Sequence, residues 1–340
     1  MFEGEYPRTL AEFDRWFATE EQCRRYLLGL RWPGGFRCPG CSSSESWLTK
    51  RGLLHCRKCG HQASITAGTV FHRTRKPLRL WFQVMWWVAG QKNGASALGL
   101  QRILGLGSYQ TAWTWLHKIR RAMVRPGRDR LTGEVEVDET FIGGVEQGGG
   151  RRHMGKKALV AVAAEVRGTG TGRIRLQRVQ DSSAQSLVGF VKKAIEPGSV
   201  VVTDGLASYL GLVAAGYAHR QRVVRGSGKE ADSLLPRVHR VASLLKRWLL
   251  GTHQGRVERK HLPYYLDEFT FRFHAEHSVM RSWPDRILQL RGFQRHGTPH
   301  NHRPSRKARS RSVARNRARP GDGSATLRRA AVFIARSASM

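Results

Sequence analysis

The cysteines are the first residues whose spacing suggests chemistry. Four of the five form two C-x-x-C pairs, Cys38 with Cys41 and Cys56 with Cys59, separated by fourteen residues. Each pair presents two thiolates within one tight turn, and the intervening residues can form a hairpin. This is the spacing of a zinc ribbon, in which four thiolates close a tetrahedral Zn²⁺ site with a structural role. Cys23 stands alone among apolar residues, and we expect it in the core.

Carboxylates form the second candidate site. The stretch GEVEVDET alternates apolar and acidic residues, so Glu134, Glu136 and Asp138 share one face of a predicted strand. The apolar run SVVVT predicts a buried strand that ends in Asp204, and Gly205 lets the backbone turn sharply behind it. Ligands in α/β domains gather at such strand ends. Alone, Asp204 is equally well explained as a turn former, because Asp-Gly is a common turn pair.

Two aspartates on neighbouring strands could bind Mg²⁺, which prefers hard oxygen ligands. A third carboxylate would let them hold two ions, which activate an attacking hydroxyl and stabilise the leaving oxygen at a phosphodiester. The downstream stretch YYLDEFTFRFH offers Asp267 and Glu268 on a predicted helix. This third acid is the weakest of the three, because an exposed helical glutamate is usually only a solvated charge.

The composition favours a polyanionic partner. The chain has 340 residues with 59 Lys and Arg against 25 Asp and Glu, a formal charge of +34 and a pI near 11.4. So large an excess of positive charge repels itself, whereas nucleic acid bound against it releases counterions. No stretch approaches the roughly 18 apolar residues of a spanning helix, and the N-terminus lacks the layout of a signal peptide. We therefore expect a soluble, intracellular protein with no membrane partner.

Two basic segments are candidates for contact with DNA. Residues 95–123 predict a helix, a glycine-containing turn and a second helix that could enter a major groove, although Trp113, Trp115 and Leu116 suit a buried helical hairpin equally well. The second segment, GTHQGRVERKH, could contact phosphates or be a solvated loop. The candidate DNA-binding residues are Lys118, Arg120, Arg121, Arg256, Arg259 and Lys260.

The remaining elements organise these sites into four segments. We expect N-terminal helices and the zinc ribbon in residues 1–76, a helical helix-turn-helix-like segment in 77–127, and a mixed α/β domain in 128–274. Within it, residues 146–157 are expected to form a mobile hairpin loop. Residues 275–340 hold 15 Lys and Arg against three acids, which is typical of a disordered basic tail.

Taken together, the motifs resemble those of bacterial insertion-sequence transposases of the DDE type that carry a zinc ribbon and an ISXO-like transposase domain. The resembling stretches are CPGC, CRKC, GEVEVDETFIGG, VVTDG and GTHQGRVERKHLPYYLDEFTFRF. The resemblance implies a ribonuclease-H-like fold in which Asp138, Asp204 and Glu268 are the catalytic acids and the Mg²⁺ ligands, with Mn²⁺ able to substitute.

The same resemblance implies an activity and partners. Such transposases bind the terminal inverted repeats of double-stranded DNA, cut the 3′ ends by hydrolysis, and use the freed 3′-hydroxyl to attack target DNA. It further implies a homodimer or higher assembly on DNA in the bacterial cytoplasm, associated with the nucleoid.

Two departures from the family keep alternatives open. His274 stands where asparagine is frequent, and Ala275 stands where a basic residue is usual. The Arg/Ser/Pro-rich sequence that follows resembles a GC-rich frame read in the wrong register, so we hypothesise a frameshift or recombined end near residues 274–277. The alternatives to an active transposase are a catalytically impaired remnant and a zinc-ribbon regulatory protein whose acids are structural.

Overall fold

The computed structural model describes residues 7–124, 127–143, 157–222, 234–255 and 257–275. The predictions for the loop at 146–156, for Arg256 and for the tail beyond residue 275, including the frameshift, lie outside these residues. Within them, no helix is both long and apolar enough to cross a membrane.

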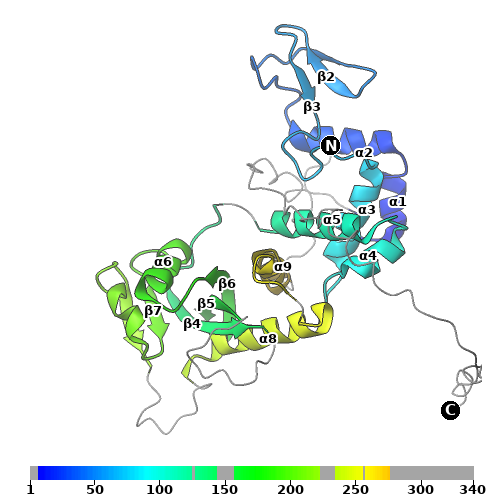
Figure 1. Ribbon diagram of the computed structural model, residues 1–340. Helices are drawn as coiled ribbons and strands as arrows, with labels where there is room; N and C mark the ends of the chain where they lie inside the picture. The colour runs from blue at the N-terminus through cyan, green and yellow to red at the C-terminus, as the bar shows by residue number, and fades with distance from the viewer. Residues whose placement is uncertain (1–6, 125–126, 144–156, 223–233, 256, 276–340) are drawn as a thin grey trace, which may run out of the picture. The chain divides into compact units, whose positions relative to one another are not determined.

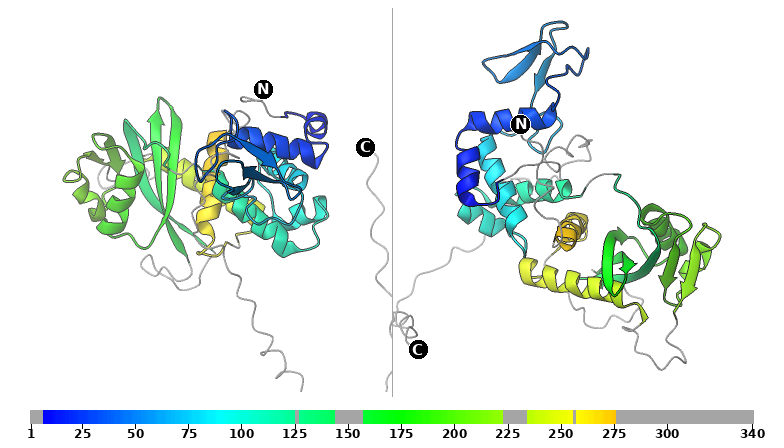
Figure 2. Two further views of the ribbon diagram at one scale, coloured as in Figure 1. Left: turned by 90° about the horizontal axis from the view of Figure 1, so that it is seen from above. Right: turned by 180° about the vertical axis from the view of Figure 1, so that it is seen from behind.

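The N-terminal half combines helices with a small sheet (Figures 1 and 2). Thr9 and Thr19 begin the first two helices, each with a reciprocal capping box, which explains why these short helices start where they do. The small sheet is antiparallel in the order β1-β2-β3. The elements of this half are α1 (Leu10–Trp16), α2 (Glu20–Arg31), β1 (Ser46–Leu48), β2 (Leu53–Cys56), β3 (Gln62–Ser64), α3 (Leu78–Gly90), α4 (Ala97–Ile103) and α5 (Tyr109–Ala122).

An aromatic core holds these helices together. Phe17 packs edge-on against Tyr26 and Phe82, and the rings of Trp81 on α3 and Trp115 on α5 stack with centroids 3.8 Å apart. Cys23 is fully buried in this core, as its apolar surroundings predicted. Helices α4 and α5 follow each other across a short turn, and the tryptophan stack buries one face of α5, as the hairpin interpretation requires; contact of α5 with DNA stays a prediction.

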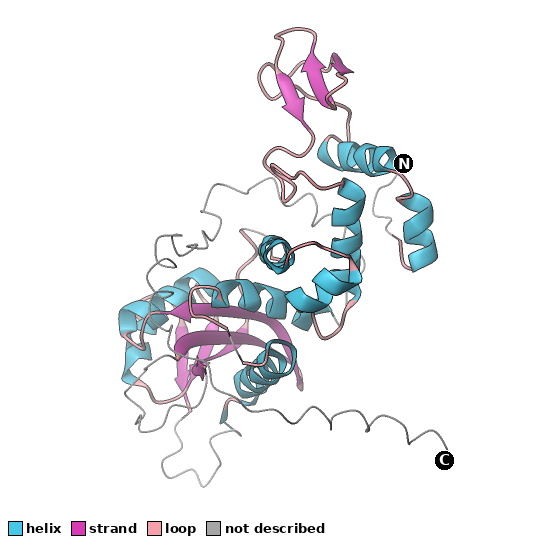
Figure 3. Ribbon diagram, turned by 45° about the vertical axis from the view of Figure 1, so that its right-hand side comes forward, coloured by secondary structure: helices cyan, strands magenta, loops and turns pink. Residues whose placement is uncertain are grey.

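The second half contains a five-stranded mixed sheet with helices on both faces (Figure 3). Its strand order is β6-β5-β4-β7-β8; the first three strands are antiparallel, and β7 and β8 run parallel to β4. This is the expected ribonuclease-H-like arrangement. The elements of this half are β4 (Glu134–Ile142), β5 (Ala158–Arg167), β6 (Gly170–Val179), α6 (Ala184–Ala194), β7 (Val200–Thr203), η1 (Ala207–Leu212), β8 (Ala218–Gln221), α8 (Pro236–His253) and α9 (Leu262–Ala275).

Two hydrophobic cores sandwich the sheet. Val201 packs in the core beneath α6 and η1, whereas Val202 packs in the core beneath α8 and α9. The valine run is therefore buried on both faces, as a central parallel strand requires. This burial fixes the position of the strand end that carries Asp204.

Candidate active site

The four paired cysteines converge at one end of the small sheet. The Sγ atoms of Cys38 and Cys59 lie 3.5 Å apart and those of Cys41 and Cys56 lie 3.6 Å apart. Thiolates about 2.3 Å from a tetrahedral zinc ion lie about 3.8 Å from one another, so the group fits Zn²⁺. Among the described residues, it is the one cluster of three or more His, Cys, Asp or Glu side chains close enough to hold an ion.

Backbone hydrogen bonds favour the ionised, metal-binding form of the Cys56 thiol. The N–H groups of Cys59 and Lys58 point at the Cys56 sulfur and lower the pKa of this thiol to about 6. Because the thiolate is the metal-binding form, this supports a structural zinc site.

The two aspartates come together through the parallel pairing of β4 and β7. Glu136 lies opposite Val202 in this pairing, and continuing the register by two residues directs Asp204, just past the end of β7, toward Asp138 in the middle of β4. Burial raises the pKa of Asp138, and the nearby negative charge of Asp204 raises it further. Asp204 also accepts a hydrogen bond from the backbone N–H of Leu206 at 3.0 Å. The same residue is therefore both a turn former and a neighbour of Asp138.

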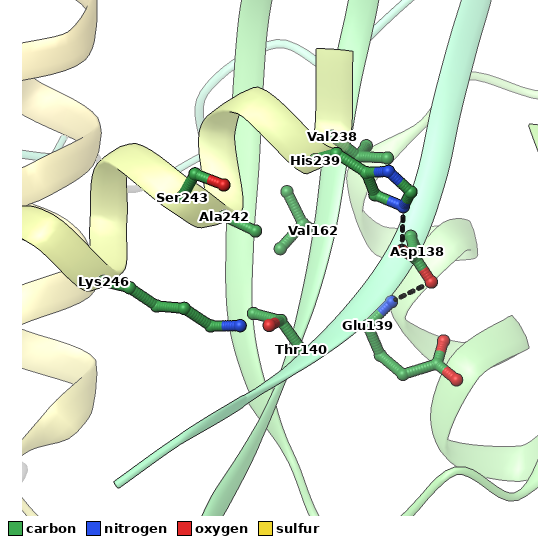
Figure 4. Close-up of a pocket in the computed structure, with 9 residues that line it drawn as sticks. All are labelled: Asp138, Glu139, Thr140, Val162, Val238, His239, Ala242, Ser243 and Lys246. Atoms are coloured by element: carbon green, nitrogen blue, oxygen red, sulfur yellow. Dashed lines mark hydrogen bonds and ion pairs between the residues drawn. The ribbon is translucent and has the colours of Figure 1, made fainter. Parts of the chain in front are cut away.

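A histidine completes this pair of acids. His239, in the first turns of α8, lies with Nε2 3.1 Å from Oδ2 of Asp138, while Oδ1 of Asp138 accepts the N–H of Glu139 at 2.8 Å (Figure 4). The side chains of His239, Ser243 and Lys246 follow one face of α8 and line a pocket whose other wall is β4. Figure 4 shows the Lys246 side chain reaching into this pocket.

Glu139 adds a second titratable carboxyl at the pocket. Tyr209 of η1 donates its hydroxyl to Oε2 of Glu139 at 2.8 Å. Burial, together with the charges of Asp138 and Asp204, raises the pKa of Glu139 to about 7 although this hydrogen bond opposes the shift. A glutamate that is half-protonated near neutral pH therefore lies beside the aspartates.

The structure does not bring Glu268 to the aspartates. Its side chain is 1% exposed and lies between two arginines, with Oε2 2.6 Å from Nε of Arg120 and Oε1 2.6 Å from Nη2 of Arg272. Burial favours the neutral acid, but both guanidinium groups lower the pKa of Glu268 and keep it ionised. The neighbouring Asp267 pairs with Arg121 at 3.5 Å. The expectation that this helix supplies the third acid of the site is corrected by this geometry.

Arg120 requires a correction for the same reason. Predicted to contact DNA, it is 2% exposed, ion-paired with Glu268 and stacked over the ring of Tyr265 at 4.3 Å. Its Nη2 also donates to the carbonyl of Ala95 at 3.3 Å. A guanidinium group enclosed in this way is not exposed to a phosphate.

The other basic candidates differ in exposure. Lys118 is half-buried with Nζ 5.7 Å from the centroid of the Trp81 ring, and burial lowers its pKa. The side chain of Arg121 is about half exposed, and Arg259 and Lys260 are exposed. Lys260 forms a 2.9 Å ion pair with Glu258. These four residues stay candidates for contact with DNA.

The sequence analysis missed His239 and Lys246. The available signal is a helix that begins 32 residues after Asp204. It carries His239, Ser243 and Lys246 at positions i, i+4 and i+7. Such spacing places three polar side chains on one helix face. It could have identified the face but not the strand against which that face packs.

Two family models match the chain. Residues 130–274 match the ISXO2-like transposase domain, and residues 18–62 match the transposase zinc-ribbon domain. The two matches together cover more than half of the chain, and they coincide with the five-stranded domain and with the segment that contains the cysteine cluster. The chain belongs to the insertion-sequence transposases.

One relative from a transposable element agrees with this assignment. The transposase is 26% identical over 278 residues to an uncharacterized protein in the transposable element ISH50 of Halobacterium salinarum, a match that covers 75% of this chain and 91% of that protein. A solved Mos1 transposase paired-end complex with the left transposon end is similar at 14% identity and a TM-score of 0.23, over 62% of this chain and 77% of that one. A TM-score this low supports no structural argument. The fold of the transposase rests on its strand order and on the family models.

Proposed function

We propose that this transposase cleaves and joins DNA at the pocket between β4 and α8, with Asp138, Asp204 and His239 as its catalytic residues. One observation carries the proposal: His239 Nε2 lies 3.1 Å from Asp138, whose carboxylate also has Asp204 as a charged neighbour. In this proposal, His239 takes the place expected for Glu268. The substrate is double-stranded DNA that carries the terminal inverted repeats of the element.

The residues present fit a divalent cation. Mg²⁺ usually takes one or two carboxylates, with water and substrate phosphate oxygens completing its shell, and Asp138 and Asp204 supply these hard ligands. Imidazole is a softer ligand that suits Mn²⁺ or a protonation role better than direct binding to Mg²⁺. When bound, one or two such ions polarise the phosphodiester and favour ionisation of the attacking water or hydroxyl.

The other residues at the pocket have separate roles. His239 orients the Asp138 carboxylate and can exchange a proton with the attacking or leaving oxygen. Lys246, two turns further along α8, presents a positive charge to the phosphate of the strand being cut. Helix α5 and the basic residues Lys118, Arg121, Arg259 and Lys260 hold the duplex, and an assembly of at least two subunits brings two element ends together.

A cleavage assay on duplexes that carry the element ends tests these roles. Asp138→Asn and Asp204→Asn should each lose about a thousandfold or more in rate with Mg²⁺ or Mn²⁺, because stabilisation by bound metal is worth several kcal/mol. His239→Ala should lose about 100- to 10,000-fold, the usual contribution of a general acid–base group. Glu134→Gln is the matched control, because Glu134 lies on the same strand but pairs with Arg220 and Arg222.

The assay also separates the alternative functions. A remnant impaired by its C-terminus binds the ends but cannot complete strand transfer, and a restored C-terminus recovers the reaction. If the protein regulates through its zinc ribbon instead, both aspartate variants keep every measurable activity. Activity kept by both aspartate variants would refute the proposed active site.

A further inference from the structure

Glu136 is a buried carboxylate that the proposed chemistry does not use. It lies on the α8-facing side of β4, two residues before Asp138, and its side chain is 1% exposed. Burying a carboxylate is costly unless donors replace the lost water. Here Oε2 accepts the backbone N–H of Arg237 at 2.7 Å and that of Val238 at 3.2 Å, and Oε1 accepts Nη1 of Arg237 at 3.1 Å. All three donors belong to the first turn of α8.

Helix α8 lacks a cap of its own. Its N-cap residue, Leu235, has no side-chain acceptor, and Pro236 occupies the first helical position. The N–H groups of the second and third helical residues have no partner within any helix, and Ser, Thr, Asp or Asn at the N-cap normally accepts one of them. In this helix they are the groups of Arg237 and Val238, and Glu136 accepts both from a strand 101 residues earlier in the chain. The positive end of the helix dipole further favours a carboxylate at this point.

The cap and the catalytic contact are successive connections between the same two elements. On β4, two residues separate Glu136 from Asp138, a rise of about 7 Å along the strand. On α8, His239 directly follows Val238 and begins the regular backbone bonding of the helix by donating its N–H to Leu235. Fixing the first turn of α8 at Glu136 therefore fixes where the imidazole of His239 meets Asp138.

We propose that Glu136 is a positioning residue of the active site: its carboxylate replaces the missing N-cap of α8 and so holds His239 against Asp138. Glu136 touches neither DNA nor metal in this role. The inference rests on the proposed function, in which Asp138 and His239 act together.

The test compares Glu136→Gln with Glu165→Gln in the full-length chain. Glu165 on β5 is a close match: it is buried, accepts the backbone N–H groups of Thr132 at 2.9 Å and Arg173 at 3.1 Å, and pairs with the Arg173 guanidinium at 2.6 Å. Neither Thr132 nor Arg173 lies on α8. A glutamine has one acceptor oxygen, so in either variant at least one donor loses its partner.

Two readouts are needed. Hydrogen exchange of the amides of residues 237–239 should become about tenfold faster or more in Glu136→Gln and stay unchanged in Glu165→Gln, because only the former removes a carboxylate that accepts amides of α8. The kcat of DNA cleavage per folded molecule should fall about 10- to 100-fold in Glu136→Gln with KM for DNA unchanged, because a small displacement of a catalytic group costs rate rather than affinity. Glu165→Gln should keep the wild-type kcat.

Any of three results would overturn the positioning role. Glu136→Gln could keep the wild-type kcat, its exchange at residues 237–239 could stay unchanged, or Glu165→Gln could lose as much kcat. If Glu136→Gln does not fold, Glu136→Asp keeps the charge but withdraws the carboxylate by one carbon–carbon bond, and the same two outcomes decide. Failure of the proposed function itself looks different: the wild-type chain would not cleave, or His239→Ala would cleave normally. The exchange measurement reports on the cap in either case.

Discussion

At the scale of single residues, ionisable side chains have very different surroundings in this transposase. Asp138 lines a pocket with Asp204 as a charged neighbour, whereas Glu268 is enclosed between two guanidinium groups. A carboxylate in such an enclosure is already neutralised by Arg120 and Arg272, and no other charge is needed to explain its burial. The residue type alone therefore does not distinguish a catalytic acid from a structural one.

Glu268→Gln should destabilise the fold rather than act selectively on chemistry. Removing one member of a buried ionic group leaves uncompensated charge, and we expect the free energy of unfolding to fall by about 3–5 kcal/mol in urea titrations. Cleavage per folded molecule should fall far less than in His239→Ala. Equal losses of cleavage in the two variants, with unchanged stability in Glu268→Gln, would restore Glu268 as a catalytic acid.

Buried histidines give the protein a defined pH dependence. Burial, with the charge of Arg120, lowers the pKa of His117 to about 3, and burial lowers that of His253 to about 4. Both imidazoles are neutral in the folded chain, while the unfolded chain binds protons below about pH 6.5, the ordinary value. Because the unfolded chain binds these protons more readily, the free energy of unfolding is highest above about pH 6.5. It falls as the pH drops toward the lowered pKa values, by up to about 1.4 kcal/mol per pH unit for each histidine.

Urea unfolding at pH 5.0 and pH 7.5 measures this dependence. His117 is surrounded by the rings of Trp113, Tyr264 and Tyr265, and neither of its ring nitrogens has a hydrogen-bond partner among the residues described. His117→Phe, which suits these aromatic surroundings and cannot bind a proton, should flatten the pH dependence. A slope equal to that of the wild type would show that His117 does not contribute.

At the scale of elements, the small sheet and the larger domain are stabilised differently. Strands β1, β2 and β3 have three or four residues each, and Trp47 and Leu48 of β1 are exposed. Three strands this short bury little apolar surface, although Leu54 and Ala63 pack into the N-terminal core, so we expect a bound metal to contribute much of their stability. The five-stranded sheet instead has an apolar core on each face.

Removing the metal should consequently unfold one element and spare the other. We expect a strong chelator, or Cys41→Ser, to make residues 37–64 susceptible to proteolysis while the five-stranded domain stays resistant. Cys23→Ala is the control, because Cys23 is a buried core residue remote from the cluster, and it should leave one zinc per chain by metal analysis. Uniform loss of structure on chelation would contradict this division.

At the scale of the whole molecule, the formal charge of +34 dominates any encounter with DNA. Each phosphate neutralised by a lysine or arginine contributes about 0.9 to the slope of log K against log salt concentration. The exposed residues Arg259 and Lys260 are placed to contribute to this slope. The enclosed Arg120 is not.

Binding to a fixed duplex at several salt concentrations tests this assignment. Replacing Arg259 and Lys260 by glutamine should reduce the slope by up to about two and weaken binding to all sequences alike. Glu258→Gln should act in the opposite direction, because it releases Lys260 from a 2.9 Å ion pair. An unchanged slope in the double variant would remove this segment from the DNA-binding surface.

The sequence by itself determined the features that depend on neighbours along the chain. Cysteine spacing specified the metal cluster, strand alternation located Asp138, and the valine run located Asp204 at the end of a buried strand. The ribonuclease-H-like fold class came from the family resemblance, whereas the strand order came from the structure. These predictions succeeded because periodicity and turn chemistry act over a few residues.

Only the tertiary structure decided which helical side chain reaches the aspartates. His239 lies 101 residues after Asp138, and Glu268 lies 148 residues after Arg120, so neither contact leaves a local pattern. These two contacts depend on how α8 and α9 are rotated about their own axes against neighbouring elements. The packing of each helix's whole apolar face sets this rotation, and no single charge does. The same packing places Glu136 at the start of α8, where a strand carboxylate caps a helix that its own sequence leaves uncapped.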